Sequence, residues 1–283
     1  MVAARSFLID ATFLLEDAEK AFLGSAAIVD SHGRNNSVVY GAVRDMLRLR
    51  GTLGIVSGVV IVGAEATKVS TMPNIENLRD CPRALGTFVV HEPNARVGTL
   101  CLSILKDRKG RWIVTRDKSL MQLVGPRCGV ILTAEGATPE AVTVQKLAAD
   151  FGIRPDQTPS FLALTESGSG VALSRKQAVR LLEVHGTLDG IFKKTAAIAA
   201  SAKIKKHLIE NKVALLGRLA DLTAQDDDST TAPICDLVRD DDDGKRTLKA
   251  YGFPSLGRLM THPGRVELVT EVNGRGPRVC RRC

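Results

Sequence analysis

Residues 6–10 read Ser-Phe-Leu-Ile-Asp, a short apolar run that ends in a carboxylate, and two later stretches repeat the pattern. Residues 88–92 read Phe-Val-Val-His-Glu, and residues 112–117 read Trp-Ile-Val-Thr-Arg-Asp. Each run has the length and the apolar character of a buried strand, and helix-like sequence follows each one. The three stretches therefore predict a sheet whose strands each lead into a helix, with an acid near every junction.

The acids at these junctions are Asp10, Glu92 and Asp117. Because the carboxyl ends of neighbouring strands lie along one edge of an open α/β sheet, we expect the three acids to converge at that edge. Carboxylate oxygens are hard ligands that suit a divalent cation, so the acids form a candidate metal site. The alternative interpretation of each acid is a helix cap, which accepts hydrogen bonds from the first N–H groups of the following helix.

The spacing of apolar and turn residues predicts an α/β fold over the first half of the chain. Strands are expected at about 5–10, 54–63, 87–91, 112–115 and 128–132. Helices are expected after the first strand through Phe22, and at 38–49, 93–106 and 117–124. This alternation is typical of a mostly parallel sheet covered by helices. Residues 64–86 interrupt it as an irregular excursion.

The pattern changes after Thr138, beyond which we find only helical signals. Helices are expected at 139–151, 155–164, 174–185, 187–193 and 196–223. The predicted organisation is an α/β domain over 1–137, a helical region over 138–225, an acidic linker and docking helix over 226–260, and a basic tail over 261–283.

The charge of the chain is unevenly distributed. The formal net charge is +8, from 39 basic and 31 acidic residues. Residues 226–243 hold eight Asp and one Arg, a net charge of −7, so the rest of the chain carries +15. Such an excess favours a polyanionic partner, most simply nucleic acid. A solvated basic surface that serves solubility is the alternative.

The composition predicts a folded cytoplasmic protein. Hydrophobic residues make up 44% of the chain, which favours a large core and excludes wholesale disorder. The most apolar window, 53–64, is shorter than the roughly 20 residues that span a bilayer, so we expect no membrane segment. The six cysteines have the scattered spacing of reduced thiols. Cys280 and Cys283 form a CxxC that we interpret as incidental, with zinc or redox chemistry as the alternative.

Several motifs, in order, resemble those of one enzyme family. Residues 8–11 read Leu-Ile-Asp-Ala, and residues 115–124 read Thr-Arg-Asp-Lys-Ser-Leu-Met-Gln-Leu-Val. They are similar to the Leu-Ile-Asp-Gly and Thr-Gly-Asp-Lys-Asp-Leu-Leu-Gln-Leu-Val of the 5′–3′ exonucleases, the family of the DNA polymerase I 5′-nuclease domain and the flap endonucleases. Residues 39–47, 152–164 and 176–188 also resemble that family, so the likeness runs from about residue 6 to 260.

The resemblance implies a fold and a chemistry. The fold is a three-layer α/β domain of the PIN-like or resolvase-like kind, with a mostly parallel sheet and a helical C-terminal half. Family members hydrolyse phosphodiesters with carboxylates that hold two divalent metal ions. Asp10, Glu92 and Asp117 fall on acid positions of the family, so the resemblance implies that they are catalytic and bind Mg²⁺ or Mn²⁺ if the protein is active.

Other acid positions of the family are lost, which predicts a degenerate active site. Gly63, Asn94, Ala95 and Ser119 stand where the family has Asp. Residues 166–173 read Glu-Ser-Gly-Ser-Gly-Val-Ala-Leu where the family has a longer hairpin loop with two Asp ligands. Glu65 and Glu166 are alternative sources of oxygen ligands, which we favour less than simple loss.

The basic positions are better preserved than the acids. Lys118 lies beside the predicted site, and Arg175 and Lys176 open the helix where the family contacts the phosphate backbone. Lys203, Lys205 and Lys206 lie on the last long predicted helix. Contacts from such residues give affinity that depends on salt but not on base sequence.

These observations predict a nucleic-acid-binding protein. We expect it to bind branched or end-containing DNA, in preference to RNA, with hydrolysis weak or lost. One alternative is an active metal-dependent 5′–3′ exonuclease. Another is a protein-interaction scaffold with a replication or repair partner.

Overall fold

The structure is a computed structural model that divides the chain into two compact units, Met1–Arg116 with Asp227–Cys283, and Asp117–Asp226. The described residues are 6–30, 32–55, 57–66, 77–78, 87–106, 111–166, 172–194, 201–225, 241–251 and 253–256. Most of the excursion at 64–86, most of the acidic segment, the hairpin residues 167–171, and the basic tail with Cys280 and Cys283 lie outside them.

The first unit is built on four parallel strands in the order β3-β2-β1-β4. They are β1 (Ser6–Asp10), β2 (Ser57–Val62), β3 (Thr87–His91) and β4 (Arg111–Thr115). The central strand β1 pairs on both sides, with Ile9 opposite Val60 and Val114. A parallel strand covered on both faces carries an unbroken apolar run, which is why Phe7, Leu8 and Ile9 are all at most 1% exposed.

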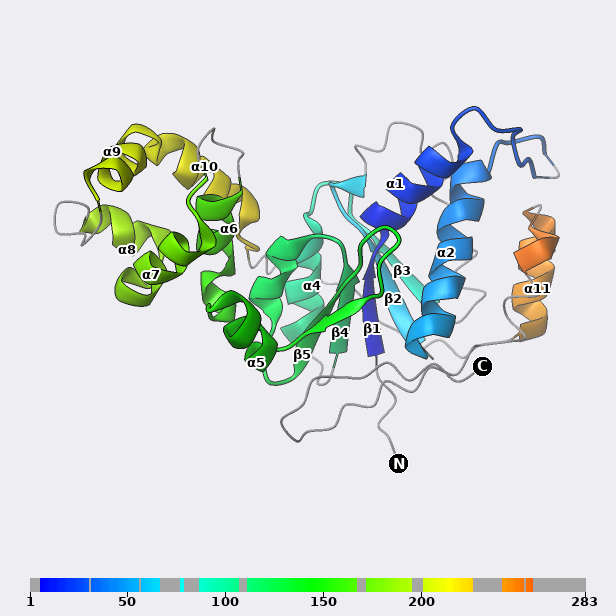
Figure 1. Ribbon diagram of the computed structural model, residues 1–283. Helices are drawn as coiled ribbons and strands as arrows, with labels where there is room; N and C mark the ends of the chain where they lie inside the picture. The colour runs from blue at the N-terminus through cyan, green and yellow to red at the C-terminus, as the bar shows by residue number, and fades with distance from the viewer. Residues whose placement is uncertain are drawn as a thin grey trace. The chain divides into compact units, whose positions relative to one another are not determined.

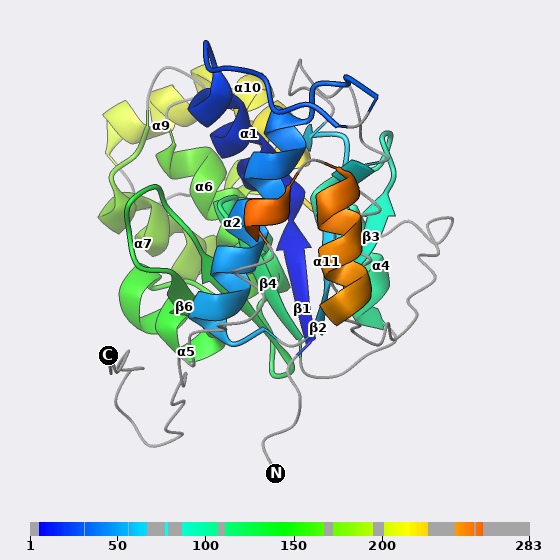
Figure 2. The same ribbon diagram turned by 90° about the vertical axis from the view of Figure 1, so that its right-hand side faces the viewer.

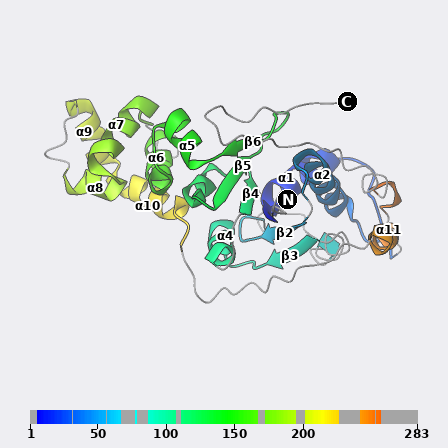
Figure 3. The ribbon, with the colours of Figure 1, turned by 90° about the horizontal axis from the view of Figure 1, so that it is seen from below.

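Helices cover both faces of these strands. Figure 1 and Figure 3 show α1 (Ala11–Phe22) and α2 (Ser37–Leu53) on one face and α4 (Val97–Lys106) on the other. Helix α2 ends at Gly54, whose φ of 63° puts it in the left-handed region, and its N–H donates to the carbonyl of Arg50. Glycine reaches that conformation without steric cost, so it is the residue that stops the helix.

A C-terminal segment packs on α2 in the same unit. Figure 2 shows α11 (Asp241–Ala250) alongside α2, and the short helix η6 (Pro254–Leu256) follows it. The buried ring of Phe253 meets Tyr40 of α2 edge to face, at 5.3 Å between centroids. Tyr40 also contacts Phe22 at 5.8 Å, so three aromatic rings join α1, α2 and the C-terminal segment.

The second unit begins with short elements around a hairpin. These are η2 (Lys118–Leu123), β5 (Cys128–Leu132), β6 (Glu140–Val142), α5 (Val144–Lys146), η3 (Leu147–Phe151) and η4 (Pro155–Gln157). Strands β5 and β6 are antiparallel, with Val130 opposite Val142. The expectation of only helix beyond residue 138 was therefore wrong, because pairing with β5 makes residues 140–142 a strand despite their local preference.

Five further helices lie in the described part of this unit. They are α6 (Thr158–Thr165), α7 (Arg175–His185), α8 (Leu188–Lys193), α9 (Ala202–Glu210) and α10 (Lys212–Leu222). The single long helix expected at 196–223 was also wrong, since the chain breaks between α9 and α10. There the amide of Asn211 donates to the carbonyl of His207, and such a side chain competes with the helical backbone pattern.

Buried polar side chains hold α6 to the α7–α8 turn. Gln157 accepts from the N–H of Arg154 and donates to the carbonyls of Leu182 and Gly186. The hydroxyl of Ser160 accepts from the N–H of Leu188 at 3.0 Å. These bonds satisfy backbone groups that helix ends leave open.

The predicted class, an α/β fold with a mostly parallel sheet, is confirmed in these elements, while the predicted domain boundaries stay predictions. Over the described residues, no helix combines the length and the apolarity needed to cross a membrane.

Candidate active site and basic region

Asp10 is the last residue of β1 and the N-cap of α1, and its carboxylate is buried. The residue is 4% exposed, and its two oxygens accept from different elements. Oδ1 accepts from the N–H of Thr12 at 2.9 Å, and Oδ2 accepts from the hydroxyl of Thr115 at the end of β4 at 2.7 Å. The capping interpretation of Asp10 is therefore confirmed, and the same carboxylate also ties β1 to β4.

Gly63 directly follows β2, the strand that pairs with β1 on one side and with β3 on the other. Asp10 ends β1 and Glu92 follows β3, so Gly63 stands at the end of the strand between theirs. A Cβ on this glycine would meet the carbonyl oxygen of Ala95 at 2.8 Å and the N–H nitrogen of Val97 at 2.9 Å. Both obstructing atoms are backbone, which cannot rotate away as a side chain can. The position where the family carries an acid is therefore closed to a side chain.

The turn that closes Gly63 is held by further backbone bonds. Ala64 donates its N–H to the carbonyl of Ala95 at 2.8 Å, and Glu92 donates to the carbonyl of Val62 at 3.1 Å. Glu65 adds a side-chain bond, since its Oε2 accepts from the N–H of Val97 at 3.0 Å and so caps α4. Its other oxygen lies 3.4 Å from Nε of Arg96.

Glu92 differs from the other acids. It is exposed, and its carboxylate has no hydrogen bond or ion pair to any described residue. The helix cap expected of it is instead made by Glu65, so that interpretation was wrong. Asp10 ends β1 and Glu92 directly follows β3, and these strands are two positions apart, which corresponds to about 10 Å across the sheet.

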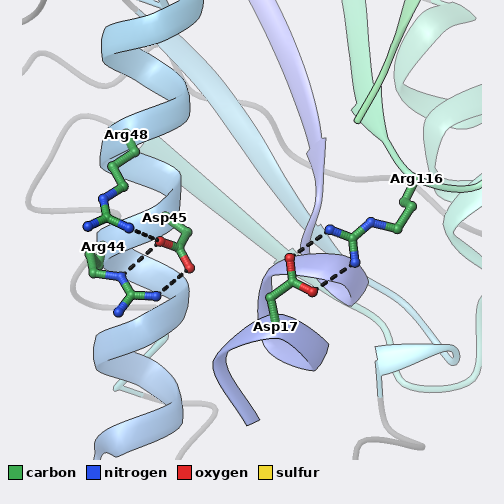
Figure 4. A network of polar contacts seen from close by, with 5 residues as sticks. All are labelled: Asp17, Arg44, Asp45, Arg48 and Arg116. Carbon is green, nitrogen blue, oxygen red and sulfur yellow. Dashed lines mark hydrogen bonds and ion pairs between the residues drawn. The ribbon is translucent and has the colours of Figure 1, made fainter. Parts of the chain in front are cut away.

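Arg116 stands at a position where the motif of the resembled family has Gly, and it pairs with Asp17. Figure 4 shows the guanidinium of Arg116 facing Asp17 of α1 in a two-bond pair, at 2.8 Å and 2.6 Å. Arg116 also stacks over the ring of Phe13, with 5.3 Å to the centroid. The hydrogen bond from Arg116 lowers the pKa of the Asp17 carboxyl, although partial burial opposes this.

We use the name acid edge for six residues of the first unit: Asp10, Asp17, Gly63, Glu65, Glu92 and Arg116. Figure 4 also shows Asp45 of α2 with Arg44 and Arg48, a separate surface cluster on the same unit.

Asp117 opens the second unit and caps η2. Its Oδ1 accepts from the N–H of Ser119 at 2.8 Å, and its Oδ2 accepts from the Ser119 hydroxyl at 2.6 Å. The capping interpretation of Asp117 is confirmed. Ser119, which replaces a family acid, thus supplies donors that bind the neighbouring acid.

Glu166 ends α6 and is neutralised within the second unit. Its Oε1 lies 3.5 Å from Nζ of Lys118, and its Oε2 accepts from Arg218 of α10 at 3.1 Å. Glu166 is therefore engaged by two cations, as Glu65 is engaged by α4 and Arg96.

The acid edge does not fit the two-ion arrangement that the resemblance implies. The Gly63 position is closed by backbone, and the Asp10 carboxylate is buried and occupied by donors. Among the described residues, no group of three or more His, Cys, Asp or Glu is arranged to hold a metal ion. The assignment of Asp10, Glu92 and Asp117 as catalytic metal ligands stays a prediction.

The second unit carries a basic region, which we define as residues 172–194 and 201–225. It holds ten Lys and Arg against four Asp and Glu, an excess of six positive charges. Arg175 and Lys176 are exposed at the start of α7, with Arg175 stacked 5.0 Å from the Phe151 ring centroid. On α9, Lys203 and Lys206 are exposed and Lys205 is half-buried. The assignment of these residues to nucleic-acid binding stays a prediction.

Sequence reasoning missed Arg218 and Gln122. The amide of Gln122 donates to the carbonyls of Ser119 and Leu222, and its oxygen accepts from the N–H of Ala224. It therefore joins η2 to the end of α10, 100 positions later in the sequence. No local sequence pattern predicts such a distant partner.

Comparison with known proteins supports the relationship that the motifs indicate. No family model matches the chain. DNA polymerase I of Streptococcus pneumoniae is 31% identical over 183 residues, which cover 60% of this chain and 20% of that protein. The chain therefore matches only about a fifth of the length of this curated relative.

Solved structures share the fold. The catalytic core of Rad2 in complex with DNA substrate has a TM-score of 0.59 at 17% identity, over 92% of both chains. A mutant of the T5 5′-exonuclease has a TM-score of 0.51 at 12% identity, over 92% of this chain and 100% of that one. A bacteriophage T5 protein co-crystallised with metal ions has a TM-score of 0.53 at 10% identity, over 92% and 100%. The predicted three-layer PIN-like fold is thereby confirmed.

Proposed function

We propose that this chain, related in sequence and in fold to the 5′–3′ exonuclease and flap endonuclease family, binds nucleic acid with phosphodiester hydrolysis weak or lost. The observation that carries this proposal is the closure of Gly63 by the backbone of Ala95 and Val97. An acidic side chain at that position would need the space that backbone atoms of Ala95 and Val97 occupy.

The engagement of the remaining acids supports weak hydrolysis. Mg²⁺ gives up its water shell reluctantly and needs several well-placed oxygens in exchange. Asp10 already accepts two internal hydrogen bonds, Glu65 caps α4, and Asp117 accepts twice from Ser119. A metal ion would have to displace these donors. If hydrolysis persists, Mg²⁺ or Mn²⁺ at Asp10, Glu92 and Asp117 is the arrangement that the resemblance implies.

The basic region supports nucleic-acid binding. Its lysines and arginines, several of them exposed, give an excess of six positive charges, and such a surface attracts the phosphates of a nucleic acid. A solved protein of this fold, Rad2, is in complex with DNA substrate, which favours DNA over RNA. Branched or end-containing DNA is the ligand class we propose. The proposal also includes a cytoplasmic location and a replication or repair protein as partner.

Cleavage and binding assays on one set of substrates test the proposal. A 5′-labelled flap DNA and a nicked duplex are incubated with the wild type and with Asp117→Ala, in Mg²⁺ and then in Mn²⁺. We expect no metal-dependent product from either protein, and a salt-sensitive shift of both DNAs in the presence of EDTA. Metal-dependent cleavage by the wild type alone would overturn the proposed loss of hydrolysis. The absence of any DNA shift at low salt would overturn the proposed binding.

A double substitution assigns the binding surface. Arg175→Ala with Lys176→Ala should weaken DNA binding and reduce the slope of log K against log salt by about 2, one unit for each lost phosphate contact. Asp117→Ala is the control and should leave both the affinity and the slope unchanged. An unchanged slope in the double variant would place the contact surface elsewhere.

A further inference from the structure

Two cations from separate elements of the second unit meet at one carboxylate. Lys118 comes from η2, Arg218 from α10, and Glu166 from the end of α6. The Lys118 ammonium lies 3.5 Å from Oε1 of Glu166, and an Arg218 terminal nitrogen donates to Oε2 at 3.1 Å. Each carboxylate oxygen therefore has its own cation.

The cluster of Lys118, Arg218 and Glu166 carries more positive than negative charge. Two positive groups face one negative group, which leaves a formal charge of +1. Arg218 is 27% exposed, and its buried Nε has no hydrogen-bond partner among the described residues. A buried guanidinium N–H without an acceptor is costly, so the pair with Glu166 leaves part of the hydrogen-bonding capacity of Arg218 unused.

Hydrogen bonds of Gln122, which we call the polar clasp, join the two elements that carry these cations. Gln122, one turn after Lys118, donates to the carbonyl of Leu222 and accepts from the N–H of Ala224 at 2.9 Å. Leu222 lies four residues after Arg218, so this clasp joins the element that carries Lys118 to the helix that carries Arg218. Such pre-organisation lowers the ordering cost of binding an anion between them.

We propose that Lys118 and Arg218 form a binding site for one backbone phosphate of the nucleic acid, and that the Glu166 carboxylate fills this site until the phosphate displaces it. A phosphodiester, like a carboxylate, presents one negative charge on two equivalent oxygens, so it can replace Glu166 at both cations. Arginine suits this exchange because its planar N–H groups pair equally with either anion. The inference rests on the proposed nucleic-acid binding and specifies one of its contact sites.

The test removes the competing carboxylate. Glu166→Gln keeps the shape of the side chain but not its charge, and should bind a nicked duplex in EDTA about 5-fold more tightly than the wild type, as expected when a charge-assisted pair no longer competes. The matched control is Glu183→Gln on α7, an exposed glutamate with no partner among the described residues, which changes the net charge by the same amount. That control should change the affinity less than about 2-fold.

A second variant tests the cation. Arg218→Ala should weaken binding and lower the slope of log K against log salt by about 1. The same substitution in the Glu166→Gln background should cancel most of the gain in affinity. Melting temperatures of all variants identify any that fail to fold, and Arg218→Lys replaces the alanine variant in that event because it keeps the charge while losing the planar fork.

The outcomes separate this inference from the proposed function. If the wild type binds DNA but Glu166→Gln and Glu183→Gln gain affinity equally, the site is refuted while nucleic-acid binding stands. If the wild type does not bind DNA, both are refuted. If inorganic phosphate raises the melting temperature of Glu166→Gln but not of Arg218→Ala, and the DNA affinities do not differ, the site takes free phosphate and the assignment to nucleic acid is wrong.

Discussion

The acid edge of the first unit and the basic region of the second unit use their charges differently. At the acid edge, Asp10, Asp17 and Glu65 are engaged by donors within the protein, and only Glu92 has an uncommitted carboxylate among the described acids of that set. In the basic region, Lys176, Lys203 and Lys206 project from helices into solvent. Lys206 lies 3.8 Å from Glu210, which is itself well exposed.

The difference lies in how far the charges of each region are already paired within the protein. A charge that is buried and hydrogen-bonded contributes to stability, because removing its partner leaves a desolvated polar group. An exposed lysine contributes little to stability and remains available to a ligand. The acid edge thus has the character of a structural network, whereas the lysines of the basic region stay exposed to solvent. We expect substitutions at the acid edge to change mainly the free energy of unfolding, and substitutions in the basic region to change mainly the affinity for DNA.

The largest effect on stability is expected at Gly63. Gly63→Ala should lower the free energy of unfolding by about 2–3 kcal/mol, because its Cβ would overlap backbone atoms of Ala95 and Val97. Gly63→Asp should cost more, since it adds a charge without space for solvent. Urea unfolding measures both.

The matched control is Gly217→Ala in α10, where nothing lies within 4 Å of the added Cβ. That substitution should stabilise the protein by about 0.5–1 kcal/mol through helix propensity. A Gly63→Asp protein as stable as the wild type, with a new Mn²⁺ affinity by calorimetry, would show that the acid edge still accepts a metal ligand.

The next effect is expected at Asp10. Asp10→Ala should cost about 2 kcal/mol of unfolding free energy, because the N–H of Thr12 and the hydroxyl of Thr115 lose their acceptor. Glu92→Ala, at the exposed acid of the same edge, should change stability by less than about 0.5 kcal/mol. Equal losses from the two substitutions would contradict the structural role assigned to Asp10.

A smaller, pH-dependent effect is expected from the Arg116–Asp17 pair. Arg116→Ala should cost about 1 kcal/mol at neutral pH, since both side chains are partly exposed and solvent screens the pair. The pair lowers the pKa of Asp17 in the folded state, so its stabilisation is fully present above the unfolded-state value of about 4 and is lost as the pH falls through the folded pKa.

Stability curves of the wild type and Arg116→Ala from pH 7 to pH 2 measure this contribution. The two curves should approach each other only in the acidic range. Arg48→Ala, at a well-exposed partner of Asp45, is the control and should cost less than about 0.5 kcal/mol. A difference between wild type and Arg116→Ala that grows on acidification would contradict the predicted sign.

The smallest effect on stability is expected in the basic region. Lys203→Ala with Lys206→Ala should change the unfolding free energy by less than about 0.5 kcal/mol. The same double variant should bind DNA more weakly and lower the salt slope by up to about 2. A large loss of stability with unchanged affinity would reverse the contrast between the two regions.

Much of this architecture was predictable from local sequence. The strand at 87–91, the strand-to-helix junction at Asp10 and the helix at 38–49 follow from apolar runs and turn residues, and the structure contains all three. Residues 140–142 and the break at Asn211 were missed. The first depends on pairing with β5, and the second on one side chain's competition for a carbonyl, so neither leaves a periodic signal.

The candidate site divides in the same way. The sequence by itself determined which acids are present, which positions depart from the motifs of the family that the chain resembles, and where the cations cluster along the chain, because those are matters of residue identity and spacing. Only the tertiary structure decided that Gly63 is closed by a turn some thirty residues later, that Glu65 rather than Glu92 caps α4, and that Arg218 joins Lys118 at Glu166. These contacts join segments distant in the chain, and the chain's folding into a close-packed unit, rather than its local preferences, sets which atoms meet.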